Sequence, residues 1–227
     1  MTETHPQDFA AQRSRMVAEV DAMYADTRSS TGFARISDPV RAAMEKVERH
    51  RLVPAAQAAL AYRNHPLPIG GGQTISQPYI VALSTDLLGL NGGETVLDIG
   101  TGSGYQAAVL AEIASRVYSI EILPALGEAA RKRLAELGYG NIEVRIGDGY
   151  QGWPEKAPFD AIVVTAAAPQ VPPALVAQLK PGGRMVIPVG GSSEIQYLKL
   201  LTKRTDGGFD EKRVLPVRFV PLVPGTR

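Results

Sequence analysis

The fold of this 227-residue chain is decided by the stretch Val96-Leu97-Asp98-Ile99-Gly100-Thr101-Gly102-Ser103-Gly104-Tyr105-Gln106. A short apolar run that contains one acid is followed by three glycines at alternate positions. We interpret this as a buried strand, a tight loop and the start of a helix, because glycine tolerates positive φ and lets a ligand approach the backbone. The dinucleotide-binding fingerprint is G-x-G-x-x-G, whereas this chain reads G-x-G-x-G. The loop therefore differs in spacing from one built around a pyrophosphate.

Composition limits the function classes. The length suits one domain, with or without an extension. Lysine and arginine number 24 against 23 acids, for a formal charge of +1, and no long basic run is present, so we expect no nucleic-acid partner. The chain has no cysteine, which excludes thiol nucleophiles, disulfides and cysteine zinc sites, and we expect no metal.

The N-terminus is polar and no apolar segment is long enough to span a bilayer. We therefore expect a cytoplasmic protein that has no membrane partner, and we expect it to be a monomer.

Before the glycine motif, the pattern favours helices joined by polar segments. Apolar residues are spaced helically over 9–23, and residues 25–32 are polar. A second helix is expected to begin at Asp38-Pro39, with the acid as N-cap. Residues 64–73, rich in proline and glycine, are expected to form an irregular loop, and Ser76-Gln77-Pro78 is expected to start a helix that runs to about Leu88.

After the motif, short apolar runs alternate with helical patterns. Strands are expected at 95–99, 116–121, 142–146, 159–165, 184–188, 195–202 and 214–222, and helices at 104–114, 123–137 and 172–179. This order predicts an α/β fold, with a doubly wound, mostly parallel, seven-stranded Rossmann-like sheet that has helices on both faces. We divide the chain into N-terminal helices with a substrate-covering loop, 1–75, and a core, 76–227, within one compact domain.

Ligands of open α/β sheets bind at the carboxyl ends of the strands. The first strand supplies Asp98 and the glycine loop, and the second ends at Glu121, whose carboxylate suits ribose hydroxyls. Asp148 follows the third strand and is expected to accept from an adenine amino group. A NAD site would share Glu121, but the glycine spacing and the lack of an obvious hydride-transfer acid disfavour it.

The segment Leu67-Pro68-Ile69-Gly70-Gly71-Gly72-Gln73-Thr74-Ile75-Ser76-Gln77-Pro78 ends in hydroxyls at an expected helix N-terminus. Free amides and the helix dipole favour an anion at such a place. The alternative is structural, with Ser76 as an ordinary N-cap.

Several of these segments together resemble the protein-L-isoaspartate O-methyltransferase family, within the class I methyltransferases that use S-adenosylmethionine. The resemblance runs from about Val40 to Leu222 and is carried by 67–78, 96–106, 147–149, 157–160, 164–169, 179–184 and 218–222. The chain departs from the family's pattern at 25–36, at 47–54 and at Asn64, which bear on the substrate face rather than on the donor site.

The resemblance implies methyl transfer from S-adenosylmethionine to the free α-carboxylate of isoaspartyl residues in damaged proteins. Ser76 is then the active-site residue. The implied donor-binding residues are Thr74, Ile75, Gln77, Asp98, Gly100, Thr101, Gly102, Ser103, Gly104, Glu121, Asp148 and Gly149. The expected substrate-side residues are Ile69, Gly70, Thr165, Ala166 and Ala167.

The chemistry agrees with these residues. A carboxylate has a pKa of roughly 4, so it is ionised at neutral pH and needs no general base. It needs alignment with the methyl carbon, and Ser76 would orient it rather than attack. Two alternatives stay open: methylation of a small metabolite or an RNA, and a non-catalytic module that binds damaged chains. The fourth strand lacks the Asn/Asp-Pro-Pro-aromatic segment expected for amino-group methylation of nucleic acid.

Overall fold

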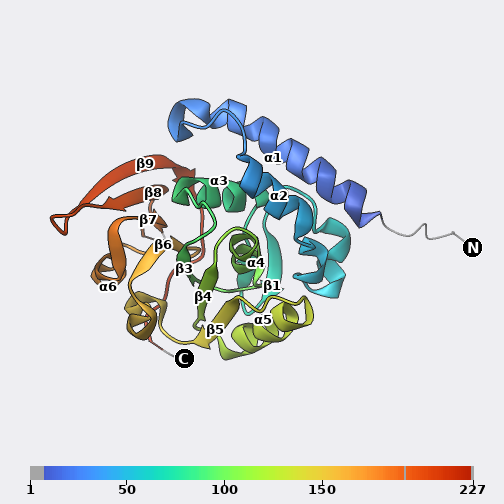
Figure 1. The fold of residues 1–227 in the computed structure, drawn as a ribbon. Coiled ribbons are helices and arrows are strands. Elements are labelled where there is room, and N and C mark those ends of the chain that lie inside the picture. The colour runs from blue at the N-terminus through green and yellow to red at the C-terminus, as the bar shows by residue number, and fades with distance from the viewer. Residues whose placement is uncertain (1–7, 192, 226–227) are drawn as a thin grey trace, which may run out of the picture.

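A seven-stranded sheet with the order β5-β4-β3-β6-β7-β8-β9 forms the centre of the computed structural model, which describes residues 8–191 and 193–225 (Figure 1). The first five strands in this order run parallel, and β8 and β9 are antiparallel to their neighbours. The strands are β3 Thr95–Ile99, β4 Arg116–Glu121, β5 Ile142–Ile146, β6 Phe159–Val164, β7 Leu179–Val189, β8 Gln196–Lys203 and β9 Phe209–Val217. The predicted doubly wound, mostly parallel sheet is confirmed.

The two faces of the sheet pack against different elements. Alternate residues of a strand point to opposite faces. Val96 and Val163 thus join a cluster with the helices α1 Phe9–Thr31, α2 Asp38–Lys46, α3 Pro78–Leu88 and α4 Tyr105–Ala111. Leu97 and Ile162 face the other way, toward Trp153 and the short helix α6 Pro173–Ala177. The helix α5 Pro124–Glu136 packs beside β4 and β5.

The N-terminal helices share the core of the sheet. Met16, Val20 and Met44 belong to the same buried cluster as Val96 and Val163. In Figure 1, α1 is drawn in blue and lies across the outside of the molecule over α2 and α3, which it contacts. The N-terminal helices and the sheet therefore share one hydrophobic core, which extends across the boundary drawn at residue 75.

Three expectations for the N-terminal part were wrong. The first helix continues through the polar stretch to Thr31, because residues 25–30 lie largely on its solvent face while Thr27 and Thr31 bond to carbonyls of the preceding turn. Asp38 is the first residue of α2, and Ser37 is the N-cap. Residues expected as an irregular loop include a hairpin of β1 Leu67–Gly70 and β2 Gln73–Ile75.

The helix after this hairpin also begins later than expected. Gln77 is the N-cap of α3, so Ser76 lies one residue before the cap and is not the N-cap that the sequence suggested. Two short 3₁₀ helices, η1 Arg49–Arg51 and η2 Ala55–Leu60, precede the hairpin. Two more, η3 Gly149–Gln151 and η4 Pro154–Lys156, lie between β5 and β6.

The last strand lies earlier in the chain than predicted, at 209–217 rather than 214–222. It begins directly after the Asp206-Gly207-Gly208 turn, because an edge strand pairs through its backbone and its charged residues remain exposed. In the part of the chain that the structure describes, no helix is both long and apolar enough to cross a membrane.

Candidate active site

A cavity of about 230 Å³ lies at the carboxyl ends of the parallel strands. The glycine loop, the end of β4, the start of η3 and the loop after β6 form one side. The segment from β2 to α3 and residues 220–223 close it. The expected ligand-binding edge of the sheet therefore holds a cavity.

The glycine loop fits closely against the end of β6. Gly100 has φ +96°, and a Cβ there would lie 2.5 Å from Thr165 Oγ1. That hydroxyl donates a hydrogen bond to Gly100 O at 2.8 Å. A side chain at this position would be strained and would displace Thr165, so glycine is required here for geometry as well as for ligand access.

Glu121 lines the cavity and also holds the glycine loop. Its side chain is buried, and one carboxylate oxygen accepts from the Gly102 amide at 2.7 Å. The other accepts from the Leu123 amide at 3.0 Å. Each carboxylate oxygen has a second lone pair, so the group can still accept from ligand hydroxyls. The sequence suggested Glu121 as an acceptor for ribose hydroxyls but did not predict its hydrogen bond with the Gly102 amide of the glycine loop.

Asp98 lies beneath the loop and outside the cavity lining. It is fully buried, and its carboxylate accepts from Ser119 Oγ at 2.7 Å. Ser119 Oγ in turn lies 2.6 Å from Thr101 Oγ1, which lines the cavity. Burial raises the pKa of Asp98 to about 7. Asp98 thus reaches the cavity wall through two hydroxyls rather than directly.

Asp148 and Gly149 occupy different positions. Gly149 lines the cavity, and a Cβ there would come within 2.5 Å of Ile99 Cγ2. The Asp148 carboxylate caps η3 by accepting from the Tyr150 amide at 2.8 Å, and its other oxygen accepts from the Gly225 amide at 3.0 Å. Asp148 therefore fixes the turn that presents Gly149.

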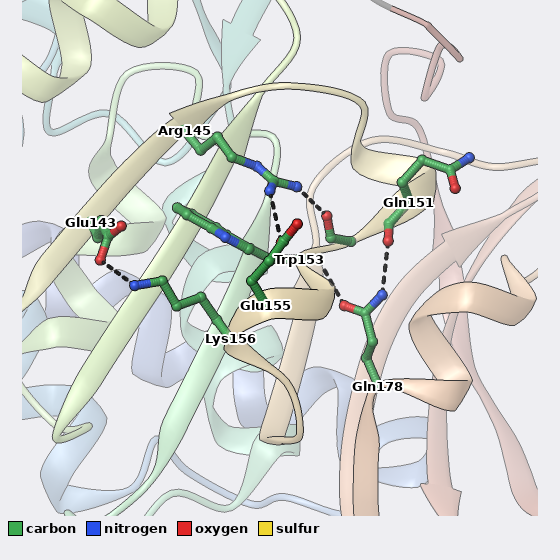
Figure 2. A network of polar contacts seen from close by, with 8 residues as sticks. Glu143, Arg145, Gln151, Trp153, Glu155, Lys156 and Gln178 are labelled. Carbon is green, nitrogen blue, oxygen red and sulfur yellow. Dashed lines mark hydrogen bonds and ion pairs between the residues drawn. The ribbon is translucent and has the colours of Figure 1, made fainter.

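Figure 2 shows the polar network that holds the chain after this turn. Arg145 stacks over the Trp153 ring at 4.4 Å and donates to Gly152 O at 2.6 Å. Gln178 accepts from the Trp153 amide and donates to Gln151 O. Ion pairs join Lys156 to Glu143 and Arg145 to Glu155. This network braces the side of the cavity that Gly149 forms.

A second cavity, of about 480 Å³, adjoins the first. Its lining comes from 66–80, from Thr165 and from 216–220. Thr74, Ser76, Thr165 and Val220 line both cavities, so the two meet at these residues. Ser76 is half-buried at this junction.

The charge of the first cavity limits its ligand. Among the described residues, its lining includes one carboxylate, that of Glu121, and no lysine, arginine or histidine. A pyrophosphate would find no cationic side chain here, whereas a ligand with hydroxyls and a positive charge suits the carboxylate. The described residues also contain no cluster of three or more potential metal ligands.

A sequence model of the protein-L-isoaspartate(D-aspartate) O-methyltransferases matches residues 22–227. The chain belongs to this family. Members of the family methylate isoaspartyl residues of damaged proteins with S-adenosylmethionine as donor. The resemblance inferred from the sequence is confirmed, and with it the class of enzyme.

Individual relatives agree with this membership. Protein-L-isoaspartate O-methyltransferase 1 of Nitrosospira multiformis is 60% identical over 96% of this chain and 89% of its own length. A solved protein-L-isoaspartate O-methyltransferase is 29% identical, with a TM-score of 0.80, over 94% of this chain and 66% of its own. A Plasmodium falciparum structure that holds S-adenosyl-L-homocysteine is 23% identical and shares the fold, with a TM-score of 0.74 over 96% of this chain and 99% of its own.

The structure brings most of the predicted isoaspartyl methyltransferase residues to the two cavities. The lining of one or both includes Thr74, Ile75, Ser76, Gln77, Gly100, Thr101, Gly102, Ser103, Glu121, Gly149, Thr165 and Ala166. Asp98, Gly104, Asp148, Ile69, Gly70 and Ala167 lie outside both linings.

Two of the residues outside the linings support the site from nearby. Ile69 is buried, and its Cδ1 would lie 3.3 Å from a Cβ built on Gly102. Ala167 pairs with the C-terminal segment: its amide donates to Val220 O, and its carbonyl accepts from the Leu222 amide. By contrast, Gly70 is exposed on the β1–β2 hairpin.

Sequence reasoning missed parts of the site that come from distant segments. Residues 220–223 form one cavity wall, although the sequence marked them only as part of a family signature. Tyr105 and Gln106, directly after the glycines, also line the cavity. Arg49, 27 positions from Ser76, donates to its carbonyl. No local pattern predicts such a contact.

Proposed function

We propose that this chain transfers the methyl group of S-adenosylmethionine to the free α-carboxylate of L-isoaspartyl residues, with the donor in the smaller cavity and the peptide in the larger. The observation that carries the proposal is the shared wall at Thr74, Ser76 and Thr165. A methyl group and its acceptor must meet, and these residues border both cavities.

The residues of the first cavity fit the donor. The glycine loop exposes backbone to it, Glu121 offers a carboxylate to ribose hydroxyls, and no cationic side chain of the described lining opposes a sulfonium. When bound, the donor supplies an electrophilic methyl group on that sulfonium. Thr101 and Ser103 provide further polar groups, and Gly149 leaves room for a flat base.

The lack of a free base among the described residues fits a carboxylate acceptor, because Glu121, the one carboxylate of the two linings, already accepts from two backbone amides. Across both linings the ionisable side chains are Glu121 and Tyr105 in the first cavity and Arg218 in the second. Burial, the largest cause, raises the pKa of Tyr105 to about 12, so it carries its proton at neutral pH. Amines and hydroxyls lose a proton on methylation and profit from a base, whereas a carboxylate is already ionised. This favours an isoaspartyl substrate over a metabolite amine or an RNA base.

Ser76 is the proposed active-site residue, and its role is orientation. Its hydroxyl can donate to one oxygen of the substrate carboxylate while the other oxygen faces the methyl group. Among the residues that the structure describes, neither lining contains a histidine or lysine that could activate it as a nucleophile. After transfer, the methyl ester can cyclise to a succinimide without the enzyme, and hydrolysis then returns part of the material to aspartate.

We further propose that the chain acts as a monomer in the cytoplasm, without nucleic acid. Three exposed large apolar residues are found in the described part of the chain: Leu60, Ile195 and Phe209. Leu60 lies in η2, Ile195 just before β8 and Phe209 in β9, and three side chains are far fewer than the roughly 20–30 residues that each partner contributes to an interface of ordinary size. Residues 1–75 then act as the covering part and 76–227 as the donor-binding core. Light scattering in solution, which gives the molar mass of the particle, tests whether the chain is a monomer.

The decisive test uses labelled methyl donor with paired isoaspartyl and aspartyl peptides of the same sequence. We expect base-labile methyl incorporation into the isoaspartyl peptide alone. Equal labelling of both peptides would contradict the proposed substrate. Binding of the isoaspartyl peptide without turnover would instead support the non-catalytic module.

A further inference from the structure

A single arginine lies buried between the two walls of the active site. Arg49, in η1, is 0% exposed. Its Nε donates to Ala61 O at 2.8 Å, and its Nη2 donates to Ser76 O at 2.8 Å. Its guanidinium carbon lies 4.5 Å from the centre of the Tyr105 ring.

The surroundings of this cation lack a counter-ion. No described carboxylate lies within ion-pairing distance of Arg49. Its contacts are two carbonyl oxygens and an aromatic face, and Nη1 has no hydrogen-bond partner among the described residues. Burial lowers the pKa of Arg49 to about 10, so the group is still charged at neutral pH.

An unpaired buried charge destabilises the fold relative to an apolar side chain of similar volume, so packing alone does not explain an arginine here. An apolar residue of similar volume is often as stabilising as a buried ion pair, and an unpaired buried charge costs more than a paired one. The rigid fork of arginine, with donors in fixed directions, is therefore better explained by what it holds in place.

Arg49 holds one element from each wall of the donor cavity. Ser76 precedes α3 and borders both cavities, while Tyr105 is the first residue of α4 and lines the donor cavity directly after the glycine loop. The hydrogen bond fixes the Ser76 backbone, and the guanidinium-ring stack fixes it relative to α4. This contact therefore sets the distance between the orienting hydroxyl and the donor loop.

We infer that Arg49 is a positioning residue for methyl transfer, which aligns Ser76 with the glycine loop from behind the active site. This inference rests on the proposed function of Ser76. Small misplacements of an aligning group lower the rate strongly, by about a hundredfold for roughly 1 Å. Arg49 itself lines neither cavity and contacts their walls only from behind, so its effect is expected on turnover more than on binding.

The test compares Arg49→Lys with the matched control Arg51→Met, an exposed arginine of the same short helix that pairs with Glu48. We expect Arg49→Lys to lower kcat at least tenfold, with the peptide KM and the donor Kd changed less than threefold. Arg51→Met is expected to retain wild-type kcat. Thermal unfolding of each variant measures the folded fraction, and turnover is expressed per folded molecule.

A double-mutant cycle separates positioning from a general structural role. In a Ser76→Ala background, Arg49→Lys is expected to lower kcat less than threefold, because the hydroxyl that it aligns is gone. Independent losses that multiply would overturn the inference and leave the role of Ser76 intact. Wild-type turnover in Ser76→Ala alone would instead contradict the proposed function.

Arg49→Gln provides the second variant, since it removes both the buried charge and the guanidinium that contacts the Tyr105 ring. It is expected to show the same pattern as Arg49→Lys, with the loss in kcat and its suppression by Ser76→Ala. Wild-type kcat in either folded variant would overturn the inference. Failure of both variants to fold would assign Arg49 to the core alone and would also overturn it.

Discussion

The two cavities are walled in different ways. The donor cavity is formed by a loop that is fixed at close range: Gly100 against Thr165, the Gly102 amide on Glu121, and Thr101 on Ser119. The adjoining cavity has about twice the volume, 480 against 230 Å³, and is walled by Pro66, Ile80 and the segment 216–220.

This difference suits two kinds of ligand. A cofactor is always the same molecule, so backbone contacts that admit no side chain are appropriate to it. A damaged residue arises in many sequences, so a second cavity that meets the donor cavity at Ser76 can recognise one small group and tolerate its neighbours. Substitutions on the two sides should therefore have separable effects.

The largest effect on donor binding is expected at Gly100. Gly100→Ala adds a Cβ 2.5 Å from Thr165 Oγ1 at a backbone with φ +96°. We expect donor affinity to fall more than about a hundredfold and stability by roughly 2–3 kcal/mol, measured by calorimetry and thermal unfolding. Gly182→Ala is the matched control: φ is +79° with no atom within 4 Å of the Cβ, so it shares the strain without the contact. Equal donor affinity in the two variants would contradict the close fit of the loop.

The next effect concerns Asp98, whose pKa burial raises to about 7 from an ordinary value of 3.8. Between these values the folded protein holds a proton that the unfolded chain releases, so the stability from this group falls as pH rises from about 4 to 7. The decrease is up to about 4 kcal/mol. Asp98→Asn mimics the protonated form, so its stability relative to wild type should rise over the same range. Denaturant unfolding at several pH values measures it, and a pH-independent difference would contradict the raised pKa.

Ser76→Ala tests the junction between the cavities. Loss of one hydrogen bond to a charged group is about 1.5–3 kcal/mol, which lowers the rate about ten- to a hundredfold. Donor affinity should stay within about threefold, and stability should fall by less than the roughly 1 kcal/mol of a lost N-cap, because Gln77 is the cap. Kinetics, calorimetry and melting of one variant provide the three values. Unchanged turnover per folded molecule would remove Ser76 from the mechanism.

Glu121→Ala tests the donor cavity separately from the peptide cavity. We expect it to weaken donor binding by about 1–3 kcal/mol. Two amides also lose their acceptor, so the glycine loop should loosen and stability should fall. The peptide KM at saturating donor should not change. Calorimetry and steady-state kinetics provide the comparison, and a KM effect larger than the donor effect would contradict the separation of the two cavities.

Local sequence patterns predicted the bounds of a strand correctly where the strand's own residues determine its structure. β3, β4 and β5 have the predicted bounds: β3 is a mostly apolar and buried run, whereas the edge strand β5 alternates apolar with charged residues. Gly100, Gly102 and Glu121 line the donor cavity, and each lies at or shortly after the end of a strand. The end of α1 and the start of β9 were missed, since solvent-facing polar residues carry no periodic apolar signal.

The two predicted acids that lie outside the lining, Asp98 and Asp148, have partners that are distant in the chain. Asp148 is held by the Gly225 amide, 77 positions on, and Asp98 by Ser119 on the neighbouring strand. Arg49 meets Ser76 and Tyr105 only after the N-terminal helices pack on the sheet. Such contacts set the direction of a side chain at a strand end. They join residues that are distant in the chain, so local sequence patterns do not predict them.

The pairing of Ala167 with Val220 and Leu222 has a consequence for how the molecule is made. Synthesis proceeds from the N-terminus, and residues 220–223 supply one wall of the donor cavity. A nascent chain that carries only the glycine loop, Glu121 and Ser76 therefore lacks one wall of the donor cavity, which residues synthesised later supply.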